Sequence, residues 1–181
     1  TFAPRFAPDG SRVVFTLDMN GNSEIYTMDL RSRARQRLTN HAAIDTSPSY
    51  SPDGSQIVFN SDRGGSPQLY VMNADGSGLR RLLPDADASH TMWPAWSPDG
   101  TVVAVERNFG AGATKIAFIK VEDGTIVESD VDASNGAAKE WSPDGTRLFV
   151  APDAANGDRL PQVLVDPVDG TATPAPWTGR S

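Results

Sequence analysis

Short apolar runs recur along the chain at a spacing of about 45 residues, and each one follows the same polar turn. Runs of this length that are rich in Val, Ile and Phe predict β-strands. They are Val13–Phe15, Ile57–Phe59, Val102–Val105 and Leu148–Val150. The turn before each run reads Ala-Pro-Asp-Gly once and Ser-Pro-Asp-Gly three times, with its aspartates at positions 9, 53, 99 and 144. A fixed period of this size indicates a repeat architecture.

The turn has a clear conformational meaning. Pro presets φ at the second position, Asp suits the third, and Gly accepts the left-handed backbone that ends the turn. The sequence therefore predicts strand, tight turn, strand at each copy. In the first repeat, a strand ends at Phe6 and further strands cover Arg12–Leu17, Glu24–Leu30 and Arg35–Thr39. The same four-strand arrangement fits the other three repeats, and no segment shows a helical period.

Four antiparallel strands per repeat are typical of a β-propeller blade. We predict an all-β fold, a β-propeller with four four-stranded antiparallel blades, each contiguous in sequence. We expect one propeller domain over residues 1–181, with blades at about 2–44, 45–90, 91–136 and 137–181. An aromatic residue precedes every turn and is expected to pack between neighbouring blades: Phe6, Tyr50, Trp96 and Trp141.

Composition narrows the range of functions. The chain contains no cysteine, which removes disulfides, thiolate nucleophiles and Cys-based metal sites. A net charge of −7 makes nucleic acid an improbable partner. The charge is uneven: residues 1–90 hold nine Arg, no Lys and ten acidic groups, whereas residues 91–181 hold seven basic and thirteen acidic groups.

Residues 50–76 carry a more specific pattern, in which the aromatic and Ser-Pro-Asp-Gly-Ser lead to Ser-Asp-Arg-Gly-Gly and then to Val-Met-Asn-Ala-Asp-Gly. Together with Ile25–Leu30 and Arg37–Asn40, it resembles the TolB propeller repeat, a WD40-like or PD40 repeat. The resemblance is close over residues 1–83 and becomes general from about residue 85. It implies a non-enzymatic periplasmic propeller of the Tol-Pal cell-envelope system that binds a Pal-like lipoprotein at the channel mouth.

Two other interpretations stay open. The compositional difference between the halves fits an engineered or recombined chimeric propeller with no native ligand. Propellers of this type also accompany hydrolase domains, so the chain could be such a domain detached from its hydrolase. The blade count leaves closure open as well: a monomeric four-bladed ring, a two-chain eight-bladed ring, or a fragment that needs further blades.

Strand direction predicts where binding would occur. The Pro-Asp-Gly turns and the Asp-Gly turns between third and fourth strands should share one end, with the aspartates capping their own backbone. The longer loops should gather at the other end and form a protein-binding face. Its candidate residues are Asp45, Thr46, Asp62, Arg63, His90, Met92, Trp93, Asn108 and Phe109. Alternatively, Trp93 packs on its own blade and Asp62 with Arg63 forms a local ion pair.

Catalysis and cofactors receive little support. His41 and His90 are the only histidines, and no His-Glu-x-x-His or Gly-x-Ser-x-Gly motif occurs. We predict no catalytic residues and no cofactor. Five aspartates would offer oxygen ligands to Ca²⁺, but solvated loop carboxylates are the favoured interpretation, and no metal site is predicted. They are Asp45, Asp85, Asp87, Asp130 and Asp132.

Overall fold

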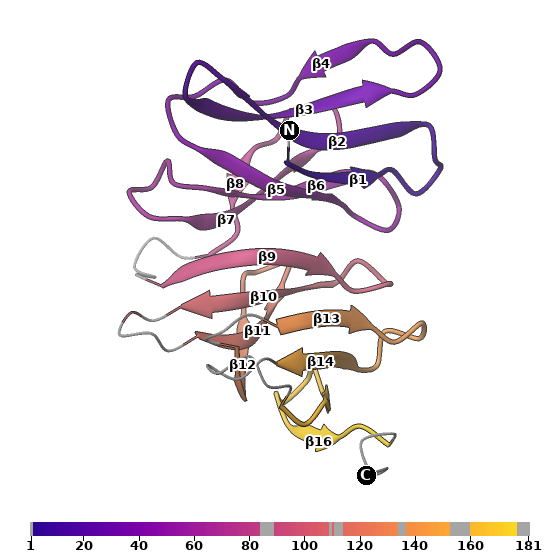
Figure 1. Ribbon diagram of the computed structural model, residues 1–181, viewed down its shortest axis with the longest axis vertical. Helices are drawn as coiled ribbons and strands as arrows, with labels where there is room; N and C mark the ends of the chain where they lie inside the picture. The colour runs from indigo at the N-terminus through magenta and orange to yellow at the C-terminus, as the bar shows by residue number, and fades with distance from the viewer. Residues whose placement is uncertain are drawn as a thin grey trace. The chain divides into compact units, whose positions relative to one another are not determined.

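The computed structural model describes residues 2–83, 89–108, 110, 114–133, 137–152 and 160–176 (Figure 1). Over these residues, all regular secondary structure is β-strand, as predicted. The chain divides into two compact units, Thr1–Trp96 and Ser97–Ser181. Each unit is described by itself.

Four antiparallel four-stranded sheets contain all the strands, and each sheet is contiguous in sequence. The first has the order β1-β2-β3-β4 and comprises β1 (Phe2–Phe6), β2 (Arg12–Met19), β3 (Asn22–Asp29) and β4 (Arg35–Arg37). The second has the order β5-β6-β7-β8 and comprises β5 (Asp45–Tyr50), β6 (Gln56–Ser61), β7 (Gln68–Asn73) and β8 (Arg80–Arg81).

The third and fourth sheets repeat this pattern. The third has the order β12-β11-β10-β9, with β9 (His90–Trp96), β10 (Val102–Asn108), β11 (Thr114–Lys120) and β12 (Ile126–Asp132). The fourth has the order β13-β14-β15-β16, with β13 (Ala137–Trp141), β14 (Leu148–Pro152), β15 (Val163–Val165) and β16 (Ala172–Pro174). The prediction of four contiguous four-stranded units is confirmed.

In the first two blades, strand length follows burial. The two middle strands of each sheet keep or exceed their predicted lengths, because their side chains are buried: β7 is buried from Gln68 to Met72. The fourth strands of these two blades are shorter than predicted. β4 ends at Arg37 instead of Thr39, and β8 keeps only Arg80 and Arg81. Exposed arginines gain little from a sheet, so only a short ladder forms there.

The Pro-Asp-Gly turns are closed by a circuit of side-chain hydrogen bonds. In the second copy, the Ser51 hydroxyl donates to the Asp53 carboxylate at 2.5 Å, and Asp53 also accepts from the backbone N–H of Ser55 at 3.0 Å. The Ser51 hydroxyl accepts in turn from the Gln56 N–H at 2.9 Å. Gly54 ends the turn at φ +73°, a conformation that glycine adopts without strain.

The same circuit recurs in the third and fourth copies. Ser97 and Ser142 donate to Asp99 and Asp144, each at 2.6 Å. In the first copy Ala7 replaces the serine, and Asp9 accepts from the N–H and hydroxyl of Ser11 at 2.9 Å each. The expectation that these aspartates cap their own backbone is thus confirmed.

Apolar faces of the first two sheets meet and form the core of unit 1. Val14 and Ile25 of the first sheet pack with Tyr50, Ile57 and Phe59 of the second, all of them buried. Burial of each such side chain contributes about 1.5–3 kcal/mol to folding. The core of unit 2 joins its sheets similarly, with residues such as Ala104, Ile116 and Phe118 beside Leu148, Val150 and Val165.

The aromatic residue before the turn joins neighbouring sheets in three of four repeats. The hydroxyls of Tyr50 and Thr27 lie 3.1 Å apart, and the indole N–H of Trp96 donates to the Ser49 carbonyl at 3.1 Å. In unit 2, Trp141 meets Phe118 edge-on, with ring centroids 5.8 Å apart.

Phe6 contradicts this expectation, because 71% of it is exposed. It pairs across the sheet with Val13, and cross-strand partners share a face. The face that packs against the second sheet instead carries the adjacent residue, Val14. Phe6 therefore points away from that interface.

Acid titration tests the turn circuit. Hydrogen bonds from the Ser51 and Ser55 hydroxyls lower the pKa of Asp53 from 3.8 to about 2. Because the folded pKa is depressed, the stabilisation is present above pH 3.8 and is lost as the pH falls toward 2. We expect Ser51→Ala to raise the pKa of Asp53, as measured by NMR titration of the carboxyl carbon. Asp9, whose turn naturally has Ala7, serves as the unaffected control; an unchanged Asp53 titration would contradict the circuit.

Candidate protein-binding surface

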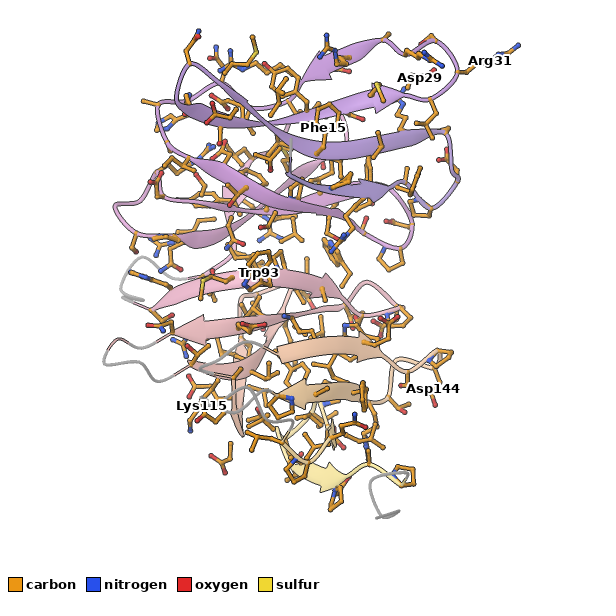
Figure 2. The ribbon with its side chains drawn as sticks, viewed as in Figure 1. Phe15, Asp29, Arg31, Trp93, Lys115 and Asp144 are labelled. Atoms are coloured by element: carbon orange, nitrogen blue, oxygen red, sulfur yellow. The ribbon has the colours of Figure 1, made fainter. Side chains whose placement is uncertain are left out.

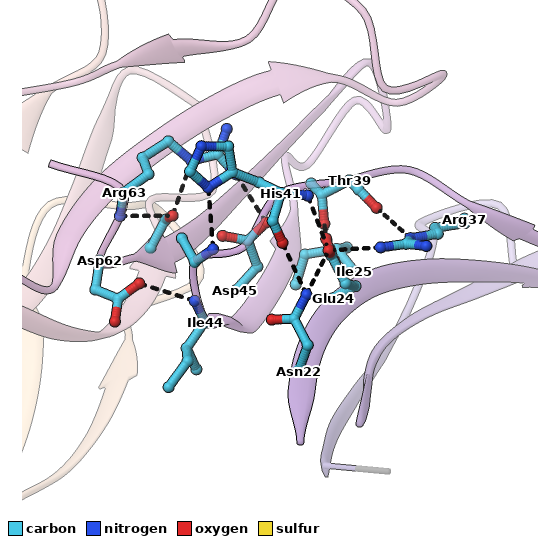
Figure 3. Close-up of polar contacts among 12 residues, drawn as sticks. Asn22, Glu24, Ile25, Arg37, Thr39, His41, Ile44, Asp45, Asp62 and Arg63 are labelled. Atoms are coloured by element: carbon cyan, nitrogen blue, oxygen red, sulfur yellow. Dashed lines mark hydrogen bonds and ion pairs between the residues drawn. The ribbon is translucent and has the colours of Figure 1, made fainter. Parts of the chain in front are cut away.

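A buried ion pair lies at the start of β5 and fixes the loop between β6 and β7. Nη2 of Arg63 lies 2.7 Å from Oδ2 of Asp45, whose side chain is fully buried (Figure 3). Nε of Arg63 also donates to the Ser61 hydroxyl at 2.8 Å. The Arg63 guanidinium lies over the rings of Phe59 and Tyr70, 5.7 and 5.1 Å from their centroids. This arginine is therefore a support for the loop, with little surface left to contact a partner.

Asp62 has a different partner from the one predicted. Its carboxylate accepts a hydrogen bond from the backbone N–H of Ile44 at 2.8 Å. The expectation of a local Asp62–Arg63 ion pair is therefore wrong. Asp62 contacts Ile44, just before β5, and Arg63 contacts Asp45, the first residue of β5. As a result, Asp45, Thr46, Asp62 and Arg63 lie together, as the binding-face hypothesis requires.

A second polar network holds the connection between β4 and β5. Glu24 is buried and accepts from the Thr39 hydroxyl at 2.5 Å, the His41 N–H at 2.9 Å and Arg37 Nη2 at 2.6 Å (Figure 3). Burial raises the pKa of Glu24, but these hydrogen bonds outweigh it and hold the pKa below 4.5. Asn22 donates to Glu24 and to the His41 carbonyl, at 3.0 and 2.8 Å.

Buried amide side chains anchor the segment before β9. Asn60 donates to the Thr91 carbonyl at 2.6 Å, and Gln68 donates to the Ser89 carbonyl. The N–H of Thr91 donates to the Pro67 carbonyl at 3.2 Å. Three contacts to the second sheet thus position His90 between two fixed neighbours, while His90 itself is exposed.

The strands β5 and β9 share an unfavourable backbone conformation. Ser47 and Trp93 each stand before a proline and have φ of +54° and +52°. In β5 the pairing register shifts between Thr46 and Ser49. Left-handed backbone at a non-glycine residue before Pro is unfavourable, by about 1–3 kcal/mol. By contrast, β13 has no proline and pairs with β14 without a shift.

Trp93 is the most exposed aromatic side chain near this surface, at 57%. The alternative in which it packs on its own blade does not describe it. Met92 is half-buried beside it (Trp93 is labelled in Figure 2). The left-handed φ of Trp93 interrupts the extended backbone of β9 at this position.

The last two candidates belong to unit 2 or lie outside the described residues. Asn108 ends β10; it donates to the Thr114 hydroxyl at 2.9 Å and accepts from the Gly110 N–H at 2.8 Å, so its contacts are local. Phe109 lies outside the described residues, as do Asp85 and Asp87. Among the residues that the structure describes, no three His, Asp or Glu side chains form a metal-binding group.

Sequence reasoning missed the residues that hold this surface in place. Glu24, Asn60 and Gln68 are buried polar residues near the ends of their strands, next to apolar residues. That position is the available signal, because a buried polar side chain requires partners. The sequence does not reveal which backbone groups those partners are.

Together, the contiguous antiparallel sheets, the shared turn and the loop-bearing inner strands define the blades of a β-propeller. Residues 1–90 match the family profile described as "TolB beta propeller domain", with the name PD40. The chain is a TolB-like β-propeller chain with PD40 repeats in its first half.

Known proteins agree with this assignment. The chain is 48% identical over 40 residues to the Tol-Pal system protein TolB of Gluconobacter oxydans, a match covering 22% of this chain and 9% of that protein. The crystal structure of TolB from Acinetobacter baumannii superposes with a TM-score of 0.76 and 34% identity over 94% of this chain and 41% of that one. A puromycin hydrolase structure shares the fold, with 19% identity and a TM-score of 0.73 over 94% of this chain and 28% of the hydrolase.

The chain thus spans less than half the length of each of these proteins. Because one natural TolB covers 94% of it, the comparisons give the recombination hypothesis no support. Within the described residues, no helix has the length and apolar character needed to cross a membrane.

A double-mutant cycle tests the buried ion pair. Arg63→Gln leaves the Asp45 carboxylate buried without its cation, so we expect a loss of about 3–5 kcal/mol in unfolding free energy. Adding Asp45→Asn should recover part of that loss, which urea unfolding would measure. As a control, Arg37→Gln should cost less, because Glu24 keeps its hydrogen bonds from Thr39 and His41. Additive losses in the cycle would mean that Asp45 and Arg63 do not interact.

Proposed function

We propose that this chain is a non-enzymatic scaffold of TolB type that binds a protein partner on the surface around Trp93. The proposed face comprises Asp45, Thr46, Asp62, Arg63, His90, Met92 and Trp93, all in unit 1. Asn108, in unit 2, and Phe109, outside the described residues, remain candidates from the sequence alone. One observation carries the proposal: an aromatic side chain that is 57% exposed stands at a left-handed backbone position before a proline.

Cost and placement together support this role. A left-handed residue before proline lowers stability, and such strain concentrates at functional sites. Exposing a large aromatic ring to water adds a further cost. Aromatic side chains are frequent energetic anchors of protein interfaces. The surroundings are rigid, since Asn60 and Gln68 hold the segment before β9 and Arg63 holds the adjacent loop.

The division of labour on this surface follows from burial. Asp45 and Arg63 form an ion pair with each other, so they support the surface and do not contact a partner through their charges. His90 and Trp93 are exposed and Met92 is half-buried, so they are the residues a partner would touch. An exposed Trp93 beside a half-buried Met92 suits a folded protein surface better than a small charged metabolite.

The partner proposed from the resemblance is a Pal-like lipoprotein, and the compartment is the periplasm. A curated relative is named as a Tol-Pal system protein, which motivates this choice. The enzyme alternative rests on likeness of fold to structures such as the puromycin hydrolase, in which the matched region covers 28% of the chain. That likeness fits a non-catalytic propeller next to a catalytic domain equally well.

Binding to a soluble Pal domain tests the proposal. We expect a complex with the wild-type chain, and Trp93→Ala should weaken it at least tenfold, a loss of the size typical of an anchor residue (about 1.4 kcal/mol or more). Isothermal titration calorimetry would measure both. Phe6→Ala is the matched control, since Phe6 is another exposed aromatic, at the turn end of its strand. Absence of binding at tens of micromolar would contradict the proposal.

We further propose that the four blades act as one propeller domain over residues 1–181, closed as a monomeric ring or as a two-chain ring of eight blades. An open apolar blade face would favour association. Light scattering distinguishes the two: a solution mass of about 19.3 kDa indicates one chain, and twice that mass indicates the two-chain ring. A concentration-dependent mixture of larger species would contradict both forms.

A further inference from the structure

The turn between β3 and β4 differs from the corresponding turns of the other blades in the residue at its left-handed position. In each of three blades the same two backbone hydrogen bonds close this turn: Asp29 with Arg33 and Ala34, Lys120 with Gly124 and Thr125, and Asp166 with Gly170 and Thr171. The corresponding left-handed residue is Gly124 at φ +74°, Gly170 at φ +76° and Arg33 at φ +60°. The first blade therefore has an arginine where the others have glycine.

This substitution carries a cost. An L-residue with a side chain in the left-handed region is unfavourable by about 1–2 kcal/mol, and glycine is not. The turn is otherwise well made: the Asp29 carboxylate accepts from the N–H groups of Arg31 and Ser32 at 3.0 and 2.7 Å. These hydrogen bonds lower the pKa of Asp29 and hold the turn in place. The strain is thus retained within a rigid hairpin.

Arg33 belongs to a dense cluster of like charge. Residues 31–37 read Arg-Ser-Arg-Ala-Arg-Gln-Arg, all exposed, in a chain whose net charge is −7. Arg37 pairs with Glu24, but among the described residues no carboxylate forms an ion pair with Arg31, Arg33 or Arg35. Figure 2 shows Arg31 extending away from the ribbon at the β3–β4 turn, with Asp29 labelled at the end of β3. We call Arg31, Arg33 and Arg35 the arginine hairpin.

The hairpin borders an open sheet edge. β4 is the last strand in its sheet. Hydrogen bonds from Asp29 N–H to the Ala34 carbonyl and from Leu38 N–H to the Ile25 carbonyl show that residues 34 and 38 turn their main chain toward β3. Because these directions alternate along a strand, the N–H and C=O groups of Arg35 and Arg37 face outward. Those groups can pair with one more strand.

We propose that the arginine hairpin and the β4 edge bind an acidic peptide segment in extended conformation. The segment adds as a strand beside β4, with main-chain hydrogen bonds to Arg35 and Arg37. Its carboxylates take the guanidinium groups, whose planar donor pairs match a carboxylate. Charge complementarity selects an acidic partner. The open main-chain groups favour a peptide over an anionic membrane, which offers no backbone to pair with them.

This surface is separate from the one around Trp93. Its residues lie on the outer strand and the β3–β4 turn of the first blade, whereas the proposed Pal-binding residues lie on β5, β9 and the adjoining loops. Loss of one binding activity therefore leaves the other intact, and the two proposals fail independently.

The test uses the full chain and a short labelled peptide of alternating Glu and Thr, followed by fluorescence anisotropy at low salt. We expect binding that weakens as salt is added. Arg31→Gln and Arg35→Gln should each weaken it about tenfold, as the loss of a charge-assisted contact predicts. The single variant Arg5→Gln is the control of equal charge change, because Arg5 is also exposed, and it should bind normally. Equal weakening in that control would show bulk charge alone and overturn the proposal.

Two further arms separate this proposal from its alternatives. Arg33→Gly should raise the urea midpoint of unfolding because the strain is relieved, and should still weaken peptide binding about tenfold. A peptide N-methylated at alternate residues loses the N–H groups that would donate to the C=O groups of Arg35 and Arg37. It should bind at least tenfold more weakly. Equal affinity of the methylated peptide, or binding of phosphatidylglycerol vesicles without binding of the peptide, would overturn the proposal.

Discussion

Burial of one sheet face against the next is the constraint on which the rest of this molecule depends. Val14 and Ile25 have no exposed surface only because Tyr50, Ile57 and Phe59 cover them from the neighbouring sheet. A single four-stranded sheet has two faces and buries neither by itself. Once two sheets stack, the segment joining them must cross from an outer strand to an inner one. The polar networks around Glu24 and Asp45 secure that crossing and so set the position of the loops.

Non-glycine residues in left-handed backbone occur in unit 1 where the surface departs from simple repetition. Ser47 on β5 and Trp93 on β9 each precede a proline, and Arg33 occupies a turn position that is glycine in two other blades. Asn20, in the β2–β3 turn, is a residue type that tolerates this conformation. The stacking core supplies enough stability for the other three to persist. The packed core thus allows strained backbone conformations to persist at the surface positions where a partner would bind.

The architecture could be predicted from the sequence because short local patterns determine it. The turns at Asp53, Asp99 and Asp144 and the apolar runs after them fix strand order without knowledge of distant contacts. Exposure was harder to predict: Phe6 pairs with Val13 in the same register as Tyr50 with Ile57, but the first sheet covers Tyr50 and no described sheet covers Phe6. The partner of Arg63 was also missed. Asp45 is 18 residues from Arg63 in sequence. No local pattern indicates that Arg63 would pair with Asp45 instead of its sequence neighbour Asp62.

The hydroxyl-capped turns have a consequence for colloidal behaviour. Hydrogen bonds from Ser142 and Thr146 lower the pKa of Asp144 to about 2, and those from Ser51 and Ser55 do the same for Asp53. These turns keep their negative charge in acid far below the range in which ordinary carboxylates become neutral. Two molecules approaching turn to turn therefore repel each other even in acidified surroundings. A repeat whose exposed strand edges can promote aggregation thus carries, in its own turn motif, a negative charge that persists down to about pH 2 and opposes turn-to-turn contact.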